Sequence, residues 1–394
     1  MDYWWRPPRP RDRAEMAGPP PVIPPPSRST WTVSDLECLV LRVPTDQPEA
    51  DGTLAWSATT VVVVVVRAGG MIGMGWTYAG AGSKAVVEEQ LAAVVLGADP
   101  MDVPGITEAG IRACRNLGRP GAVSSAISAV DIALWDLKAR LLHQPLSALF
   151  GRCRADVPIY GSGGFTTYDD ATTTAQLELW VGEWEIPRVK IKIGESWGTN
   201  PERDLARVKL TRSVVGDAVE IYVDANGGYT RKQAVRMGRR FGDEYGVVWF
   251  EEPVSSDDLV GLREVRDHLD IDVAAGEYGY DETYFATMVA AEAVDCLQVD
   301  VTRCGGYTSW LRAAAIAGSR GLQVSAHCAP NLHAHVASAV PNLRHVEYFH
   351  DHHRIETMLF DGALDPRGGV LMAADRPGHG LALRTSVAAE YRVR

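Results

Sequence analysis

The chain has 394 residues, of which 46% are hydrophobic and 23% charged, a composition typical of globular proteins that excludes a wholly disordered chain. The length predicts two or three domains, or one large barrel with an attached domain. With 50 acidic and 39 basic residues, the net charge of −11 argues against a general affinity for nucleic acid or anionic membranes. The longest purely aliphatic run, residues 61–66, is far shorter than the roughly 20 residues that span a bilayer. Six cysteines without a CxxC pair favour a cytoplasmic protein over a disulfide scaffold.

The first part of the chain divides into a tail and an α+β domain. Residues 1–30 contain two runs of three prolines and no secretory segment, which predicts a flexible or polyproline II tail. Alternating patterns then predict an antiparallel meander, with a polar loop at 44–55 between its first two strands. Three helical patterns follow, the strongest at 124–142, so residues 31–150 are predicted to form one α+β domain.

The second part of the chain has a repeating texture. Short apolar runs alternate with amphipathic helical patterns, which predicts a parallel sheet. Eight repeats within residues 151–350 predict a (β/α)8-type barrel. Residues 351–394 contain no further β–α unit and are expected to pack back on the α+β domain. The eight predicted strands are 157–160, 189–193, 219–223, 247–250, 271–274, 296–299, 322–325 and 345–349.

Polar residues stand at the ends of these strands. From the third strand onward they follow one another at intervals of 20 to 27 residues, the length of one β–α unit. Their side chains are therefore predicted to converge at the C-terminal mouth, where the active sites of barrel enzymes lie. The residues are Lys190, Lys192, Asp224, Glu251, Glu277, Asp300, His327 and Glu347.

Three carboxylates from consecutive units predict a metal site. Asp224, Glu251 and Glu277 would repel one another strongly unless a hard cation lay between them, and Mg²⁺ prefers oxygen ligands. No Cys or His belongs to this trio, which disfavours zinc. Alternatively, each carboxylate caps the helix that follows it. Their occurrence in three successive units favours the metal site.

Two groups of residues are candidates for proton transfer. Lys190 and Lys192 alternate on one strand, so both point into the mouth, and each is expected to depress the other's pKa, making Lys192 a usable base. The alternative is a pair of surface lysines. Asp300 beside His327 would fix the imidazole tautomer and create a second base, against the alternative of a core histidine.

Three further residues near the mouth are interpreted less strongly. Glu347 is a candidate general acid, or a hydrogen-bond donor to a developing oxyanion. Cys304 and Cys328 are interpreted as structural, because nothing in the sequence would activate them.

These motifs together resemble the enolase superfamily, mandelate racemase subgroup, from about Val33 to Leu383. The carrying segments are Val-Lys-Ile-Lys-Ile-Gly around the two lysines, Val-Asp-Ala-Asn-Gly-Gly-Tyr at Asp224, Trp-Phe-Glu-Glu-Pro at Glu251 and Ala-Gly-Glu at Glu277. Asp300 followed by Gly305-Gly306, then His327, and the helix 128–136 complete the match. No single motif is decisive, but their order and spacing are highly specific.

The resemblance implies a capping domain that closes an enolase-like modified TIM barrel, and abstraction of the proton α to a carboxylate to give a Mg²⁺-stabilised enediolate. The superfamily uses Lys or His bases with Mg²⁺. By resemblance, Lys192 is one base, Lys190 binds the substrate carboxylate, and the His327–Asp300 pair is the base on the opposite face. Asn226 would touch a substrate hydroxyl. The partner is a small-molecule carboxylate, and the chain is expected to form a homo-oligomer, a dimer or octamer.

The resemblance leaves two candidate reactions. Muconate-lactonizing relatives have a lysine where Asp300 stands here, so the site looks like the mandelate racemase type, whose members racemise 2-hydroxy acids or dehydrate sugar acids. Dehydration to a 2-keto-3-deoxy acid is favoured. Specificity is expected in segments 44–55 and 76–82, where Trp76 and Tyr78 would form a wall that also suits racemisation of a less polar substrate. A catalytically inactive binding barrel is disfavoured, because every expected ligand and base is present.

Overall fold

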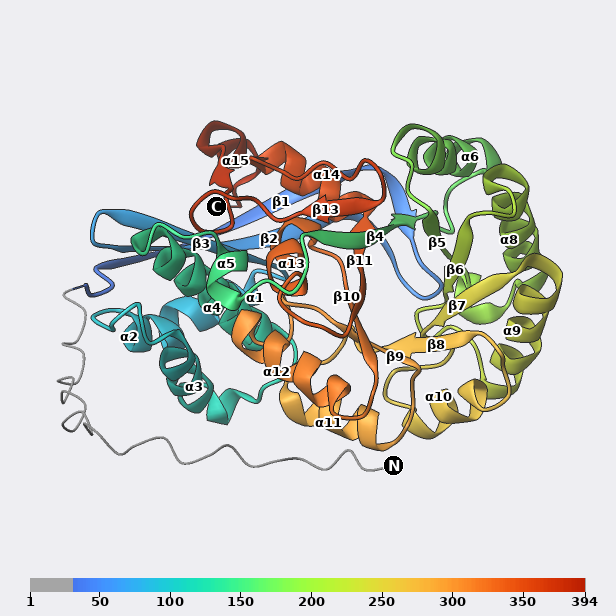
Figure 1. The fold of residues 1–394 in the computed structure, drawn as a ribbon, viewed down its shortest axis with the longest axis horizontal. Coiled ribbons are helices and arrows are strands. Elements are labelled where there is room, and N and C mark those ends of the chain that lie inside the picture. Colours follow the sequence, from blue (N-terminus) through green and yellow to red (C-terminus); the bar gives the residue numbers. More distant parts are fainter. Residues whose placement is uncertain (1–30, 394) are drawn as a thin grey trace, which may run out of the picture. The chain divides into compact units, whose positions relative to one another are not determined.

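The structure is a computed structural model that describes residues 31–393. The predicted tail at 1–30 lies outside the described residues. Figure 1 shows two parts in this region, an N-terminal cap and a barrel. Within residues 31–393, no helix is both long and apolar enough to cross a membrane.

The cap is an antiparallel sheet covered by helices. Its strands are β1 (Asp35–Ala50), β2 (Ala55–Ala68) and β3 (Met71–Tyr78), in that order. The first of the three predicted helices is divided by a π-helical turn. The helical segments are α1 (Gly82–Val86), η1 (Val87–Leu91), α2 (Ala92–Val95), α3 (Val103–Ala113), η2 (Arg115–Leu117), α4 (Ala122–Leu141) and α5 (Leu146–Phe150).

The barrel consists of eight parallel strands, closed by pairing of the last strand with the first. This confirms the predicted (β/α)8-type barrel, and each predicted strand overlaps an observed one. Helices α8 to α11 lie outside the strands in Figure 1. The strands are β4 (Asp156–Gly163), β5 (Arg188–Lys192), β6 (Glu220–Asp224), β7 (Val247–Glu251), β8 (Asp272–Ala275), β9 (Cys296–Val299), β10 (Gln323–Ala326) and β11 (Leu343–Phe349).

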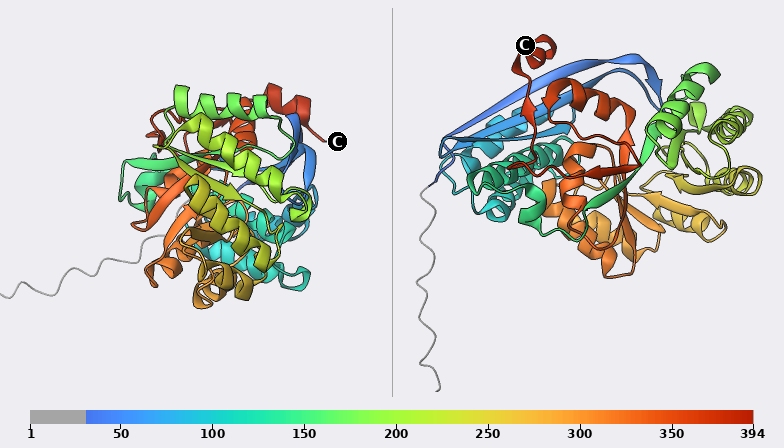
Figure 2. Two further views of the ribbon diagram at one scale, coloured as in Figure 1. Left: turned by 90° about the vertical axis from the view of Figure 1, so that its right-hand side faces the viewer. Right: turned by 45° about the horizontal axis from the view of Figure 1, so that its top comes forward.

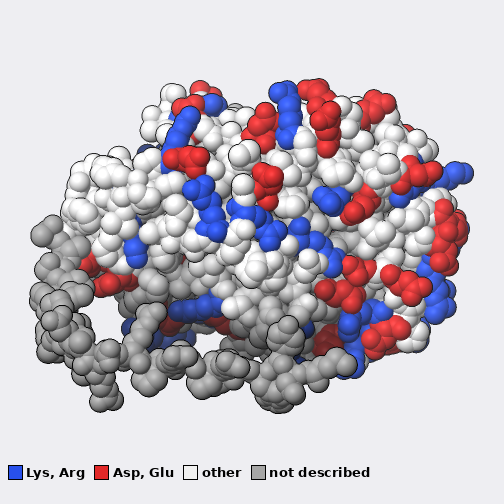
Figure 3. All heavy atoms as spheres, viewed as in Figure 1, with Lys and Arg blue, Asp and Glu red and all other residues white. Residues whose placement is uncertain are grey.

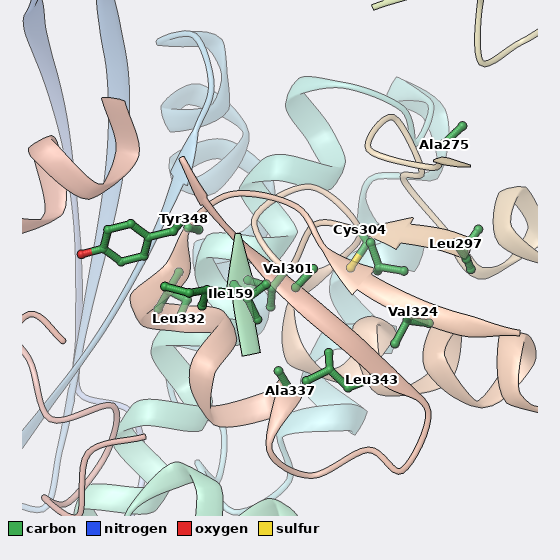
Figure 4. Packing of buried hydrophobic residues seen from close by; sticks show 14 of the residues in the cluster. Ile159, Ala275, Leu297, Val301, Cys304, Val324, Leu332, Ala337, Leu343 and Tyr348 are labelled. Atoms are coloured by element: carbon green, nitrogen blue, oxygen red, sulfur yellow. The ribbon is translucent and has the colours of Figure 1, made fainter. Parts of the chain in front are cut away.

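One or two helical segments follow each barrel strand. They are α6 (Asp170–Glu178), η3 (Leu179–Glu183), α7 (Glu195–Gly198), α8 (Pro201–Val215), α9 (Arg231–Tyr245), α10 (Leu259–Arg266), α11 (Glu282–Ala290), α12 (Gly306–Gly318), α13 (Pro330–Ala337) and α14 (His350–Leu359). Figure 4 shows how strand and helix side chains share the core: Ile159, Leu297, Val324 and Leu343 come from barrel strands, and Leu332 comes from α13. All five are buried, so the strands are held to the surrounding helices by apolar contact.

The valine run of β2 joins the two parts of the molecule. Because side chains alternate across a strand, Val61, Val63 and Val65 pack into the core that continues into the barrel, while the three even-numbered valines pack into the core of the cap. A strand buried on both faces needs a continuous run of β-branched residues.

Helix α4 packs directly on strand β3 through two glycines. A Cβ on Gly73 or Gly75 would lie 2.3 Å from a carbonyl oxygen of α4. On its other side α4 contacts α12 of the barrel. The two glycines therefore let one helix pack between the cap sheet and the barrel.

The predicted polar loop at 44–55 is wrong. Strand β1 continues to Ala50 through a bulge between Pro44 and Glu49, and β2 begins at Ala55, so the two strands form a long hairpin with a short turn. Asp51 Oδ1 accepts the backbone N–H groups of Thr53 and Leu54 and closes that turn. Polar residues occur here because part of the hairpin is exposed. A polar segment without hydrophobic periodicity is predicted as a loop, even where the chain forms a strand.

The hairpin extends from the cap sheet across to the barrel, as the right view of Figure 2 shows. Its turn is attached there by backbone hydrogen bonds: Thr166 N–H donates to Ala50 O at 2.8 Å, and Trp197 N–H donates to Gly52 O at 2.9 Å. The hairpin thereby brings cap side chains to the barrel mouth.

The C-terminal segment contacts both parts. Helix α14 completes the last β–α unit, so the expected boundary at 350/351 falls at the start of that helix. Strand β13 (Val370–Met372) pairs antiparallel with β4, and β12 (Phe360–Asp361) pairs with β14 (Ala382–Leu383). Helix α15 (Thr385–Tyr391) lies on β1 of the cap, beside a hydrogen bond from Val393 N–H to Val40 O of 2.9 Å.

The described surface carries charges of both signs. On the face shown in Figure 3, lysines and arginines lie among aspartates and glutamates rather than in a field of one sign.

The close approach of α4 to β3 yields a stability prediction. We expect Gly75→Ala to lower the free energy of unfolding by about 1–3 kcal/mol, because the added methyl group would overlap the α4 backbone. Thermal and urea unfolding followed by circular dichroism measure this loss. Gly105→Ala is the matched control, since nothing lies within 4 Å of a Cβ there and alanine favours its helix. An equal loss in both variants would contradict the packing argument.

Candidate active site

Three carboxylates meet at the barrel mouth. Asp224 and Glu251 are the last residues of β6 and β7, and Glu277 follows β8 by two residues. One oxygen of each lies within 4.8 Å of the others, and all three side chains are buried. Burial raises the pKa of Glu251 to about 8, with Asp224 adding to the rise against the opposing effect of Lys190.

The trio fits a hard divalent cation. All its donors are oxygens, the ligands that Mg²⁺ prefers. Two further buried oxygens at these strand ends, Asn226 Oδ1 and Glu252 Oε1, have no hydrogen-bond partner within residues 31–393. Burial together with Glu277 and Asp224 raises the pKa of Glu252 well above its usual value. Acceptor oxygens are thus in excess here, as expected for a cation site.

The two lysines pair with these carboxylates. Lys190 Nζ lies 2.5 Å from Glu251 Oε1 and 2.8 Å from Glu347 Oε1, and Lys192 Nζ forms an ion pair with Asp224. The predicted effect of Lys190 on Lys192 is present, but the net direction is opposite to the expected one: burial and Lys190 lower the pKa of Lys192, whereas Asp224 and the other carboxylates raise it above its usual range. A cation that compensates Asp224 would remove the main cause of that rise.

His327 is held by Asp300 as expected. Its Nδ1 donates to Asp300 Oδ2 at 2.8 Å, and the other carboxylate oxygen accepts from Thr302 N–H at 2.7 Å. Nε2 lies 3.3 Å from Glu277 Oε2, 3.3 Å from Cys328 Sγ and 3.7 Å from Glu347 Oε2. Burial lowers the pKa of His327, but the surrounding acidic groups raise it overall, so the imidazole is readily protonated.

Glu347 does not have the character expected of a general acid. It is desolvated, which raises its pKa, but Lys190 and His327 reverse this effect and hold the carboxyl well below its usual pKa. Ser162 Oγ donates to Oε1 at 2.6 Å, and Cys328 N–H donates to Oε2 at 3.1 Å. Glu347 is therefore an ionised hydrogen-bond acceptor.

A cavity of about 360 Å³ opens between the hairpin and these residues. Lys192, His327, Glu277, Glu347 and Asn226 line it from the barrel side. Lys190 is fully buried and does not line it, so the expected contact between Lys190 and the substrate carboxylate has no direct support.

The cap side of the cavity differs from the expectation at one aromatic residue. Tyr78 lines it, stacked on His352 at 3.4 Å between ring centroids, and its hydroxyl donates to Glu356 at 3.0 Å. Trp76 does not line the cavity. It precedes Tyr78 by two residues on the same strand, and its ring is buried against Phe360, on which it stacks. Of the two residues expected to form a wall of the cavity, Tyr78 lines it and Trp76 does not.

Sequence reasoning missed several lining residues. Trp56 was assigned to no element, and Arg303, whose Nη1 lies 3.2 Å from Glu277 Oε1, was not singled out although it follows Asp300 by three residues. Cys328, interpreted as structural, also lines the cavity. Its position directly after His327 at a strand end was the signal that could have identified it.

Fold and site together define a capped (β/α)8-barrel enzyme with an acidic mouth. Residues 172–387 match the family described as "Enolase C-terminal domain-like", and residues 36–151 match "Mandelate racemase / muconate lactonizing enzyme, N-terminal domain". The chain belongs to the mandelate racemase/muconate lactonizing enzyme family of the enolase superfamily.

Three relatives illustrate the similarity. A mandelate racemase/muconate lactonizing enzyme-like protein from Rubrobacter xylanophilus is 47% identical, with a TM-score of 0.89 over 92% of this chain and 100% of its own. A racemase from Streptomyces coelicolor A3(2) with bound magnesium is 29% identical, with a TM-score of 0.86 over 92% and 100%. The L-talarate/galactarate dehydratase of Salmonella typhimurium is 30% identical over 365 residues, which are 90% of this chain and 89% of the relative.

The carboxylate trio yields a cation-binding prediction. We expect Mg²⁺ to raise the melting temperature of the wild type, by a stabilisation of about 2.7 kcal/mol at a hundredfold excess over the dissociation constant. Asp224→Asn should lose this rise, because one of the three oxygen ligands is gone. Asp217→Asn, an exposed carboxylate before the same strand, is the control. An unchanged Mg²⁺ response in Asp224→Asn would contradict the assignment.

Proposed function

We propose that this enzyme dehydrates a sugar acid to a 2-keto-3-deoxy acid with Mg²⁺ as its cofactor. The observation that carries the proposal is that Lys192 and His327, two proton-transfer groups from different strands, line one cavity beside three clustered carboxylates. The Salmonella dehydratase supports a sugar acid as substrate, and the Streptomyces structure supports Mg²⁺.

Asp224, Glu251 and Glu277 would hold the cation. When bound, Mg²⁺ supplies positive charge that stabilises the negative charge developing on the substrate carboxylate. Lys190, with its ion pairs to Glu251 and Glu347, is proposed as a positioning residue that keeps both carboxylates ionised and oriented.

Lys192 is proposed as the base and His327 as the acid. Neutral Lys192 Nζ takes the proton from the carbon α to the carboxylate, and the bonding electrons move towards the carboxylate. The β-carbon–oxygen bond then breaks, and protonated His327 Nε2 gives its proton to the departing hydroxide, which leaves as water. The resulting enol tautomerises to the 2-keto acid. Because Glu347 is held ionised, His327 is the better leaving-group acid, and Asp300 with Glu277 favours its charged form.

The division of roles can be tested by separating exchange from elimination. We expect His327→Asn to lose keto-acid formation by at least about 100-fold, the contribution of a general acid, but to retain exchange of the α-proton in D₂O. Lys192→Ala should lose both. A sugar-acid library assayed with semicarbazide measures elimination, and NMR measures exchange. Loss of exchange in His327→Asn with retention in Lys192→Ala would reverse the assignment.

Racemisation of a 2-hydroxy acid is the second candidate. Two bases can serve opposite faces of one α-carbon, and the cavity lining includes Trp56, Tyr78 and Phe349, which would suit an aryl or alkyl group. Racemisation of such an acid without keto product from any sugar acid would replace dehydration and leave the proton-abstraction step standing.

The charges around the cavity favour a monocarboxylic sugar acid. Among the described residues its permanently charged lining cations are Lys192 and Arg303, and these, like the titratable His327, are paired with carboxylates at the barrel mouth. The turn of the hairpin and α14 contribute Asp51 and Asp351 instead. A second carboxylate at the distal end of a substrate would therefore meet like charge.

This charge distribution predicts substrate preference. We expect kcat/KM for aldonic acids to exceed that for aldaric acids of equal length by roughly tenfold or more, since each 1.4 kcal/mol is a factor of ten. Asp51→Asn should reduce the ratio, while the exposed Asp257→Asn should leave it unchanged. Preference for aldaric acids would contradict the charge argument without affecting the dehydration proposal.

We also propose a cytoplasmic, homo-oligomeric protein. Within residues 31–393 all six cysteines are free thiols, as expected in a reducing compartment. Light scattering on the purified full chain measures the oligomeric state, and a monomer at micromolar concentration would contradict the proposal.

A further inference from the structure

A second cluster of ligand-type atoms lies beside the carboxylate trio. His327 Nε2 lies 3.3 Å from Cys328 Sγ, Cys328 Sγ lies 3.4 Å from Glu347 Oε2, and that oxygen lies 3.7 Å from His327 Nε2. All three side chains are buried. We propose that these residues form a site for a borderline-soft divalent cation, of which Zn²⁺ is the type, separate from the hard-cation site.

The three distances approximate the edges of a coordination tetrahedron. Zinc binds nitrogen at 2.0–2.1 Å, carboxylate oxygen at 2.0–2.2 Å and sulfur at about 2.3 Å, so neighbouring ligands of a tetrahedral ion lie roughly 3.3–3.7 Å apart. Pair by pair, the observed separations differ from the expected edges by about 0.1–0.4 Å. Side-chain movements of a few tenths of an ångström would therefore complete the site.

The histidine is already oriented as a zinc ligand. Its Nδ1 donates to Asp300 Oδ2 at 2.8 Å, and Asp300 is fixed by Thr302, whose hydroxyl donates to Oδ1 at 2.8 Å. A carboxylate that accepts from the remote ring nitrogen is the usual support of a metal-bound histidine, because it fixes the tautomer and raises the basicity of the other nitrogen.

The carboxylate ligand is prepared in the same way. Glu347 Oε1 is occupied by Ser162 and Lys190, whereas the hydrogen bonds to Oε2 from the part of the chain that the structure describes are the backbone N–H of Cys328 and the weak thiol contact. Oε2 thus retains lone-pair capacity on the side that faces His327 and Cys328.

The backbone turns the thiol towards this cluster. Cys328 has φ = 54° and Ala329 has φ = 38°, left-handed conformations that are unfavourable for residues other than glycine. The carbonyl of Cys328 accepts from His333 Nδ1 at 2.8 Å, which helps to hold the turn. The resulting orientation places Cys328 in the cavity lining rather than in the core behind β10.

The two sites select different ions through their donor atoms. The trio of Asp224, Glu251 and Glu277 offers oxygen alone, which suits Mg²⁺, whereas sulfur and imidazole nitrogen favour Zn²⁺. On binding, the Cys328 thiol and the protonated His327 Nε2 each release a proton to solvent, so that the ion is coordinated by a thiolate and a neutral imidazole. Occupation of Nε2 would remove the group that we propose as the acid, so Zn²⁺ should inhibit; that consequence rests on the proposed function, whereas the binding site does not.

Cobalt absorption tests the binding site. With Mg²⁺ in excess to fill the oxygen site, Co²⁺ added to the wild type should give a near-ultraviolet thiolate-to-cobalt charge-transfer band. Cys328→Ser should lose the band, whereas Cys304→Ser, a buried thiol outside the cluster, and Asp224→Asn should keep it. Absence of the band in the wild type, or its persistence in Cys328→Ser, would overturn the proposal.

A measurement on the wild type alone covers the case in which Cys328→Ser does not fold. Zinc X-ray absorption of the Mg²⁺-saturated protein should show one sulfur at about 2.3 Å with nitrogen and oxygen at about 2.0–2.2 Å. A shell of nitrogen and oxygen without sulfur would overturn the site.

Inhibition distinguishes the site from its consequence. Zn²⁺ should inhibit the Mg²⁺-saturated wild type, and Cys328→Ser should raise the half-inhibitory concentration by roughly tenfold or more, while Cys304→Ser leaves it unchanged. An unchanged value in Cys328→Ser would overturn the site as the cause of inhibition. Binding with a sulfur ligand but without inhibition would support the site and contradict the role proposed for His327.

Discussion

The balance of buried charge at the barrel mouth is the constraint on which the site depends. Among the described residues, six carboxylates and three permanent cations project there. The carboxylates are Asp224, Glu251, Glu252, Glu277, Asp300 and Glu347, and the cations are Lys190, Lys192 and Arg303. Uncompensated charge at buried positions is strongly unfavourable, so the excess of three negative charges must be met by protons, by a dication or by both.

Where no cation is bound, protons compensate the excess negative charge at the barrel mouth. The pKa of Glu251 rises to about 8 and that of Glu252 rises well above its usual value, in both cases through burial and neighbouring carboxylates, while His327 is driven towards its charged form. A dication would take over this compensation and release the protons. The protonation states of both proposed proton-transfer groups are therefore coupled to cation occupancy, which explains why a lysine paired with Asp224 can belong to a catalytic site.

Much of the fold and the site could be predicted because each rests on local pattern. Asp224 and Glu251 end short apolar runs spaced by one β–α unit, and closure of the barrel brings such ends together whatever the loops do. Protonation states were harder to predict from the sequence, because they depend on distances between side chains of different strands. The pKa of Glu347 is lowered chiefly by an ion pair of 2.8 Å to Lys190, which lies 157 positions away along the chain. Sequence periodicity contains no information about such a contact.

The cap was the harder part, because its long hairpin gains order from partners remote in sequence. The polar segment around Asp51 reads as a loop, yet contacts with the barrel at Thr166 and Trp197 hold its turn in place. Likewise, the pleat alone puts Trp76 and Tyr78 on one face of β3, but the position of the barrel decides that the first ring stacks on Phe360 and the second reaches the cavity. Specificity in this architecture thus depends on docking between the two parts.

The order of the barrel strands explains how one mouth can hold hard and soft donor sets side by side. The neighbouring strands β6, β7 and β8 are followed by the oxygen ligands, whereas His327 and Glu347 belong to β10 and β11 further around the barrel. The left-handed turn after β10 adds one more atom, the sulfur of Cys328, to the second set. A single residue change in such a turn would alter which cations compete for the site without altering the oxygen trio. The strand ends therefore determine the reaction class, whereas the turns that follow them determine which ions and substrates reach it.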